Sequence, residues 1–144
     1  MQPLKSLDDI VFRFRATLTT RWSDEDNQAV LNNAVYLTLL EEARLRYFTD
    51  LGLMEGGSFP FVLAQSHLRF AAPGRGGEEV VVEVRTTRLG NSSFEQVSRV
   101  LHASTQELWC EAEALLVAWD PLKRGKRSMT DEFRERVAAF EGLA

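Results

Sequence analysis

Three consecutive acidic residues, Asp24, Glu25 and Asp26, lie in a polar stretch that comes shortly before a helical pattern starting near Asn33. The first turn of a helix presents free backbone N–H groups and partial positive charge, which stabilise negative charge on a carbonyl oxygen. A carboxylate beside such a site can act as a general base or as a nucleophile toward that carbonyl. Acids that only cap the helix or lie solvated in a turn are the alternative interpretation.

The sequence lacks the motifs of several other kinds of functional site. The sequence has no phosphate-binding glycine loop, no nucleophile elbow and no dinucleotide-binding fingerprint. The two histidines, His67 and His102, are far apart and have no cysteine beside them, so they are interpreted as ordinary strand residues rather than metal ligands. The single cysteine, Cys110, falls among apolar residues and is expected to be buried. We predict neither a metal nor a cofactor.

Length and composition limit the class of protein. The chain has 144 residues, of which 44% are hydrophobic and 26% charged, as expected for one globular domain over residues 1–144. The net charge of -4 argues against nucleic acid as the main partner. No apolar run approaches the roughly 18 residues of a membrane span. We expect a cytoplasmic protein that binds neither nucleic acid nor membrane.

Hydrophobic periodicity predicts the elements that must position these residues. Residues 11–20 alternate as a strand with one buried face, and residues 33–51 have helical spacing, with Asn32 or Asn33 as N-cap and Gly52 at the C-terminal end. Further elements are predicted as strands at 61–70, 79–89, 93–104 and 106–119 and a helix at 130–141. This order predicts an α+β fold in which an antiparallel five-stranded sheet packs on one long central helix.

The strand predicted at 106–119 is apolar on both faces. Alternation assigns one face to Leu108, Cys110, Ala112, Ala114, Leu116 and Ala118, and the other to Trp109, Leu115, Val117 and Trp119. Alternation in strand 61–70 likewise assigns Val62, Ala64, Leu68 and Phe70 to a single face. A sheet that is apolar on both sides needs a cover on its back, and we expect a second subunit to provide it.

Several short motifs, in a fixed order, resemble those of a known family. They are Arg21-Trp22-Ser23-Asp24-Glu25-Asp26, then Asn32-Asn33-Ala34-Val35-Tyr36, then Glu41-Glu42-Ala43-Arg44, and finally the hairpin Arg88-Leu89-Gly90-Asn91-Ser92-Ser93. Over about residues 10 to 120 the chain resembles the 4-hydroxybenzoyl-CoA thioesterase family of hotdog-fold proteins. The usual Gly-His of that family is Ala29-Val30 here, and its usual valine is Leu31. Loss of the glycine matters if that position needs a positive φ.

The resemblance implies a function and a set of site residues. It implies an acyl-CoA thioesterase that hydrolyses a fatty or aromatic acyl-CoA thioester to the free acid and CoA. It also implies a homodimer or homotetramer with active sites between subunits. The matched catalytic residues are Asp26, as base or nucleophile, and Asn33, whose backbone N–H polarises the thioester carbonyl. Substrate-binding roles carry over to Asn32, Tyr36, Ser92 and Ser93.

Some alternatives stay open at this point. A non-catalytic acyl-CoA-binding hotdog protein is the main rival, because of the Ala29-Val30 departure. A hotdog hydratase is disfavoured because no histidine lies between Asn27 and Tyr36. The basic run at 123–127 is interpreted as a solvated turn, with binding of the CoA phosphates as its alternative. The spacings of Glu41–Arg44 and Glu42–Arg46 fit ion pairs on the helix, which favours a structural or subunit-interface role over catalysis.

Overall fold

The computed structural model describes residues 4–143 and has one main antiparallel sheet. Five strands follow the order β1-β3-β4-β5-β2, and a short sixth strand pairs with β5. The elements are β1 (Phe14–Thr19), the 3-10 helix η1 (Trp22–Asp24), α1 (Asn33–Asp50), β2 (Phe61–Phe70), β3 (Glu79–Leu89), β4 (Ser93–His102), β5 (Leu108–Asp120), β6 (Gly125–Lys126) and α2 (Asp131–Glu141). The antiparallel α+β prediction is confirmed; β6, only two residues long, was not predicted.

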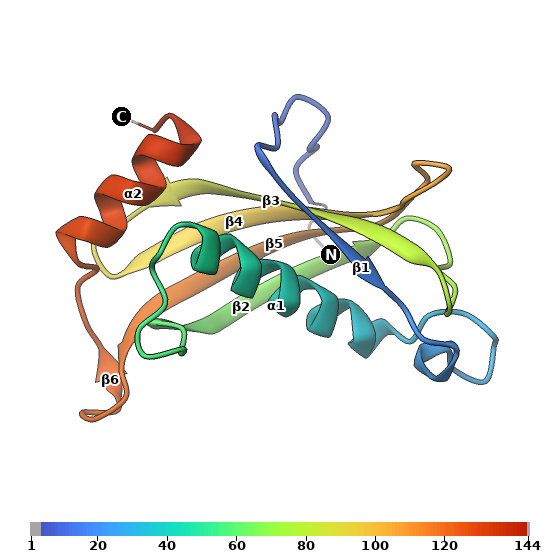
Figure 1. The fold of residues 1–144 in the computed structure, drawn as a ribbon, viewed down its shortest axis with the longest axis horizontal. Coiled ribbons are helices and arrows are strands. Elements are labelled where there is room, and N and C mark those ends of the chain that lie inside the picture. Colours follow the sequence, from blue (N-terminus) through green and yellow to red (C-terminus); the bar gives the residue numbers. More distant parts are fainter. Residues whose placement is uncertain (1–3, 144) are drawn as a thin grey trace.

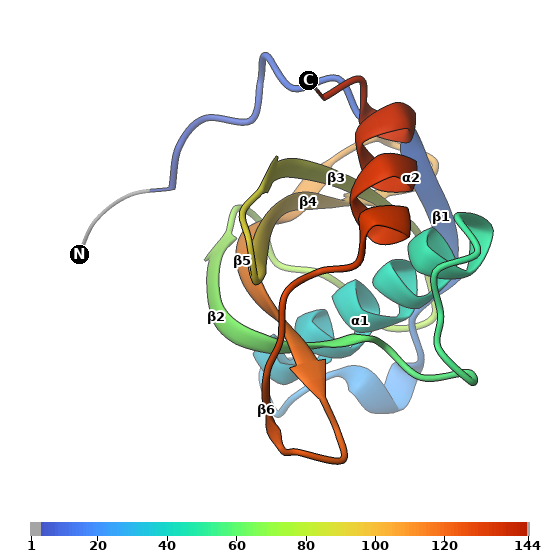
Figure 2. The ribbon, with the colours of Figure 1, turned by 90° about the vertical axis from the view of Figure 1, so that its left-hand side faces the viewer.

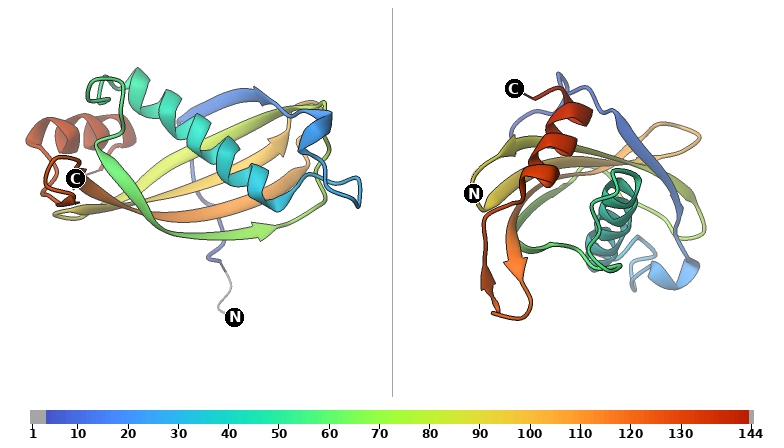
Figure 3. Two further views of the ribbon diagram at one scale, coloured as in Figure 1. Left: turned by 90° about the horizontal axis from the view of Figure 1, so that it is seen from below. Right: turned by 60° about the vertical axis from the view of Figure 1, so that its left-hand side comes forward.

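The sheet is curved, and α1 lies on its concave side (Figures 1 and 2). The N-terminal end of α1 lies at the same end of the sheet as the β4–β5 turn, whereas α2 packs near the β3–β4 hairpin at the other end (Figure 1). The views from below and from the side show the same arch of strands around α1 (Figure 3). The two ends of the sheet are therefore distinct environments, and only one of them meets the start of α1.

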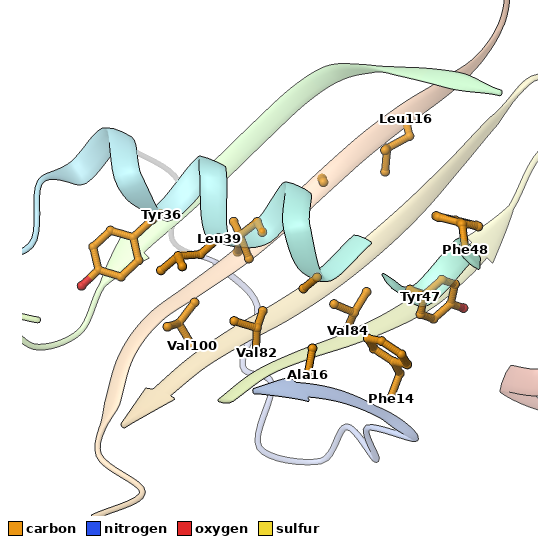
Figure 4. Close-up of a cluster of buried hydrophobic side chains, with 14 of the residues drawn as sticks. Phe14, Ala16, Tyr36, Leu39, Tyr47, Phe48, Val82, Val84, Val100 and Leu116 are labelled. Carbon is orange, nitrogen blue, oxygen red and sulfur yellow. The ribbon is translucent and has the colours of Figure 1, made fainter. Parts of the chain in front are cut away.

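Local sequence signals explain the ends and the buried face of α1. The Asn32 side chain accepts a hydrogen bond from the N–H of Ala34 at 2.9 Å, so Asn32 is the N-cap, and Gly52 adopts a φ of 70° just past the last turn. The side chains that turn toward the sheet are Tyr36, Leu39, Leu40, Ala43, Arg44, Tyr47 and Phe48. Several of them meet the valines of β3 and β4 in the core (Figure 4).

The position of Trp109 differs from the prediction because β5 contains a β-bulge. The β4–β5 register pairs Val100 with Cys110 but the next residue, Leu101, with Leu108, so Trp109 is the additional residue. Its side chain is fully buried in the main core together with Cys110. Strict alternation was therefore wrong in placing Trp109 on the back of the sheet and Leu108 with the core residues, because the bulge changes the parity of the strand.

The faces predicted for the side chains of β2 are also wrong in part, because the strand contains a second register shift. The pairing with β5 shifts between Leu63 and Gln65, which leaves Ala64 unpaired. Val62 lies opposite Val117, whereas Phe70 lies opposite the core residue Cys110. Val62 and Phe70 therefore do not share a face, contrary to the prediction, because one added residue reverses the side on which later side chains project.

The chain's own N-terminal segment covers part of the convex face, the side of the sheet away from α1. The N–H of Lys5 lies 3.4 Å from a carboxylate oxygen of Glu113, and Leu7 is only 2% exposed. The guanidinium of Arg99 lies 4.7 Å from the centre of the Phe12 ring. Part of the cover that the apolar back face needs is therefore supplied within the same chain, where we had expected only a second subunit.

A buried chain of hydrogen bonds joins α1, the sheet and α2. The Tyr47 hydroxyl donates to Glu141 Oε2 at 2.7 Å and lies 2.9 Å from Thr86 Oγ1, and the Thr86 N–H donates to the same carboxylate oxygen at 2.8 Å. Gln96 Nε2 donates to Thr86 Oγ1 at 3.1 Å and Arg44 Nε to Gln96 Oε1 at 3.1 Å. Burial lowers the pKa of Arg44 to about 10. Arg44 therefore points into the core, and the predicted surface ion pair with Glu41 is not formed.

The other predicted ion pair on α1 is present. Arg46 Nε lies 3.3 Å from a carboxylate oxygen of Glu42, and both side chains are about half exposed. This pair has the predicted four-residue spacing on the outer face of the helix.

Candidate active site

The segment between β1 and α1 folds back on itself as a small hairpin, which we call the acidic hairpin (residues 24–32). The N–H of Asp26 donates to the carbonyl of Val30 at 2.8 Å, and the N–H of Asn32 donates to the carbonyl of Asp24 at 2.8 Å. A turn closes its tip, where the N–H of Ala29 donates to the carbonyl of Asp26 at 3.0 Å. The acidic hairpin therefore ends at Asn32, directly before α1, and Asp26 lies on its first arm opposite Val30.

Two of the three adjacent acids are held by other groups. Asp24 is 7% exposed and accepts from both the backbone N–H and the guanidinium of Arg21, each at 2.8 Å. The hydrogen bonds from Arg21 hold the pKa of Asp24 below its usual value. Glu25 Oε2 accepts the N–H of Gly76 at 2.9 Å. Both side chains therefore stabilise the local structure through these hydrogen bonds.

Asp26 differs from its two neighbours. Its side chain is exposed, and Oδ1 accepts the N–H of Gln28 at 2.7 Å in a local turn. Within residues 4–143 no other hydrogen bond or ion pair to this carboxylate is present, so Oδ2 is free. A carboxylate oxygen that has no other partner is available to act as a general base or a nucleophile.

The start of α1 offers a free donor close by in the chain. Asn32 uses its side-chain oxygen for the N–H of Ala34 and its carbonyl for the N–H of Val35, each at 2.9 Å. In the described part of the chain the N–H of Asn33, the first residue of the helix, has no acceptor. Such an N–H at a helix start can bind a carbonyl oxygen on which negative charge develops.

Tyr36 lies in the first turn of α1 and is buried beneath the helix start. Its side chain is 2% exposed, and its ring centre is 5.3 Å from that of Phe70. Burial raises the pKa of its hydroxyl to about 12. A Cβ atom on Gly74 would lie 2.6 Å from that hydroxyl, so glycine is needed for this close approach. The predicted role of Tyr36 in substrate binding stays a prediction.

Ser92 and Ser93 lie at the other end of the sheet. The carbonyl of Ser92 accepts the N–H of Ala118, and Ser93 pairs with Val117 near the end of β5. The residue of β5 that lies close to Tyr36 and Gly74, near the start of α1, is instead Trp109, at the beginning of the strand. Within one chain the two serines, at the β3–β4 hairpin, are therefore not brought together with Asp26, which lies in the loop before α1.

Sequence reasoning missed the turn against which the acidic hairpin rests, which we call the glycine turn (residues 74–78). It lies between the predicted strands 61–70 and 79–89, and we assigned it no role in the site. In the structure a Cβ on Gly76 would lie 2.3 Å from the carbonyl oxygen of Arg21, so the two backbones are in close contact. The Thr20 hydroxyl donates to the carbonyl of Arg75 at 2.7 Å. Three glycines in one short loop were the available signal for such an approach.

Ala29 adopts a φ of 59° at the position where the resembling family has glycine. The left-handed conformation is therefore kept although the residue carries a Cβ. This conformation costs an alanine about 1–2 kcal/mol relative to glycine.

We expect Ala29→Gly to raise the free energy of unfolding by about 0.5–1 kcal/mol, because relief of the left-handed strain exceeds the added flexibility of the unfolded chain. Urea denaturation at one fixed protein concentration measures this change. Ala34→Gly, in the first turn of α1, is the control and should be destabilising. A loss of stability in Ala29→Gly as well would contradict the interpretation of this turn.

No cluster of three or more His, Cys, Asp or Glu side chains suited to a metal occurs in residues 4–143. Cys110 is buried, as predicted, and burial raises the pKa of its thiol to about 12. None of the described helices is long and apolar enough to cross a membrane.

Comparison with known proteins identifies a family. A model of the thioesterase-like superfamily matches residues 20–137. A thioesterase from Thermus thermophilus, solved with coenzyme A and Zn, is 34% identical, with 91% of this chain and 96% of that chain covered and a TM-score of 0.80. A search of curated proteins found no match.

More distant structures share the fold. A thioesterase superfamily protein from Jannaschia sp. CCS1 is 21% identical, with 93% of this chain and 86% of that chain covered and a TM-score of 0.83. A 1,4-dihydroxy-2-naphthoyl-CoA thioesterase from Synechocystis is 17% identical, with coverages of 87% and 95% and a TM-score of 0.77. Because the family model spans most of the chain, this protein belongs to the thioesterase-like superfamily and is a thioester hydrolase.

Proposed function

We propose that this protein hydrolyses an acyl-CoA thioester to the free acid and CoA, with Asp26 and the start of α1 as the reacting site. One observation carries the proposal: of three adjacent acids, only Asp26 is exposed and bonds nothing beyond its own turn, in a hairpin that ends at the unpaired N–H of Asn33. The relative from Thermus thermophilus, which is complexed with coenzyme A, supports the choice of CoA ester.

The roles follow from the chemistry of a thioester. The carbonyl oxygen accepts a hydrogen bond from the N–H of Asn33, which stabilises the negative charge that forms when the carbonyl carbon is attacked. In one route Asp26 removes a proton from water, the hydroxide adds to the carbon, and the CoA thiolate leaves and is protonated. In the other, Asp26 attacks the carbon, the thiolate leaves, and water hydrolyses the resulting acyl anhydride.

A second copy of the chain would complete the site. β2 is an edge strand, and its exposed residues include Val62, Leu63 and Phe70. A two-fold axis that pairs β2 with β2 of a second copy antiparallel places the Phe61 end of one strand beside the Phe70 end of the other. The ring of Phe70 contacts Tyr36, below the start of α1.

This pairing would unite the separated parts of the site. Phe61 lies opposite Ala118, whose N–H bonds the carbonyl of Ser92. The β2 pairing would therefore bring Ser92 and Ser93 of a second copy toward Asp26, together with the basic run at 123–127. In that run Arg127 is paired with Glu55, whereas Lys123, Arg124 and Lys126 are exposed, so binding of the CoA phosphates and a solvated turn both stay open as interpretations.

We expect a homodimer or homotetramer in light scattering at micromolar concentration. Leu63→Lys, which places a charge on the exposed edge strand, should shift the population toward monomer, because lysine blocks edge-to-edge pairing. Lys123→Leu, at an exposed turn outside the main sheet, is the control and should not do so. A monomeric wild-type protein would contradict the two-chain site.

A hydrolysis screen over acyl-CoA chain lengths and aromatic acyl-CoA esters tests the proposed function. We expect free thiol to be released from at least one class, with enzyme-dependent initial rates. Ala29-Val30 in place of the usual Gly-His favours one rival, a protein that binds CoA esters without cleaving them. Binding by calorimetry with no hydrolysis of any ester would support that rival.

A further inference from the structure

We propose that Glu25 is a positioning residue for the reaction: its carboxylate clamps the acidic hairpin to the glycine turn and thereby holds Asp26 in place. This inference rests on the role proposed for Asp26. It concerns a residue that sequence reasoning left in the same group as Asp24 and Asp26 without a function of its own. The structure separates the three by their partners.

Both arms of the acidic hairpin are tied to the same turn. On the first arm Glu25 Oε2 accepts the N–H of Gly76 at 2.9 Å, and on the second the N–H of Leu31 donates to the carbonyl of Gly74 at 2.9 Å. The Glu25 contact is the only hydrogen bond from a side chain of the hairpin to the glycine turn among the described residues. It acts on the residue directly before Asp26.

The glycine turn is itself firmly held. The N–H of Thr20 donates to the carbonyl of Glu78 at 2.9 Å, and Thr20 Oγ1 accepts the N–H of Glu78 at 3.1 Å. The absence of a Cβ on Gly76 lets the two backbones meet, since that atom would lie 2.3 Å from the carbonyl oxygen of Arg21. Glu25 is therefore anchored to a well-supported segment rather than to a free loop.

The expected effect of losing this clamp is on turnover. Asp24 remains bound to Arg21, so the hairpin should persist, but the arm that carries Asp26 loses its side-chain anchor. A displacement of about 1 Å at a reacting group can reduce the rate about 10²-fold. Because Asp24 and Leu31 still restrain the hairpin, we expect a smaller loss, about tenfold in kcat.

Glu25→Ala and Glu25→Gln together test the proposal in steady-state hydrolysis of the best acyl-CoA. Glu25→Ala should lower kcat about tenfold with KM changed less than about twofold, because the substrate contacts are kept. Glu25→Gln retains an oxygen acceptor for the N–H of Gly76 and should restore kcat to near wild type. Glu79→Ala, which removes an exposed carboxylate at the start of β3, is the control and should leave kcat unchanged.

Hydrogen exchange gives a readout that does not need activity. Glu25→Ala should speed exchange of the Gly76 and Leu31 amides while the amides of β3 and β4 keep their protection. Unchanged exchange at both amides would overturn the clamp, whether or not the wild type hydrolyses a thioester. Faster exchange with wild-type kcat, or a Glu25→Gln variant as slow as Glu25→Ala, would overturn the positioning role. A wild type without thioesterase activity would instead remove the proposed function itself.

Discussion

Asp26→Asn should lower kcat for acyl-CoA hydrolysis by about 10²-fold or more, the scale of losing an acid–base group. Asparagine keeps the shape and can still accept the N–H of Gln28, but it has neither the charge nor the basicity of the carboxylate. The binding of a CoA ester, measured by calorimetry, should be retained. Stopped assays of free thiol under saturating substrate measure kcat directly.

The control for this prediction needs an aspartate with no structural partner. Asp24→Asn is unsuitable, because Asp24 is buried against Arg21 and its replacement would disturb the acidic hairpin. Asp50→Asn, at the exposed C-terminal end of α1, changes charge equally and should leave kcat within about twofold of wild type. Near-wild-type turnover in Asp26→Asn would show that another group delivers the oxygen nucleophile.

Glu141→Ala should reduce the free energy of unfolding by about 3 kcal/mol. The change leaves two buried donors, the Tyr47 hydroxyl and the Thr86 N–H, without their shared acceptor, and each such loss costs about 1–3 kcal/mol. It also frees the last turn of α2 from the core, in which Glu141 is 1% exposed. Urea unfolding followed by circular dichroism at a fixed concentration measures the difference.

The matched control lies in the same helix. Glu132 forms a surface ion pair with Arg136 at 2.7 Å, and its side chain is 63% exposed, so Glu132→Ala should cost less than about 1 kcal/mol. Because both variants make the same Glu→Ala change in one helix, their difference in unfolding free energy isolates the contribution of the buried Glu141 contacts from that of helix propensity. Equal losses of stability in both variants would mean that the Glu141 contacts contribute nothing beyond the helix.

The sequence by itself determined the elements and their ends. The helical spacing of residues 33–51 predicted α1, and Asn32 and Gly52 marked its limits. These features are local: a helix is capped by residues within its own first and last turns, and its buried stripe follows from its period. The order of the motifs likewise sufficed to indicate the family, and Asp26 as the candidate site, without the tertiary structure.

Tertiary structure alone decided which partners those residues have. The bulge at Trp109 depends on the register of β4 against β5, and the separate roles of Asp24, Glu25 and Asp26 depend in part on Gly76, which lies about fifty residues away in the chain. Register and long-range hydrogen bonds form only when distant segments meet, so no local period records them. The separation of Ser92 from Asp26 within one chain has the same origin, because it follows from the direction of β5 across the sheet.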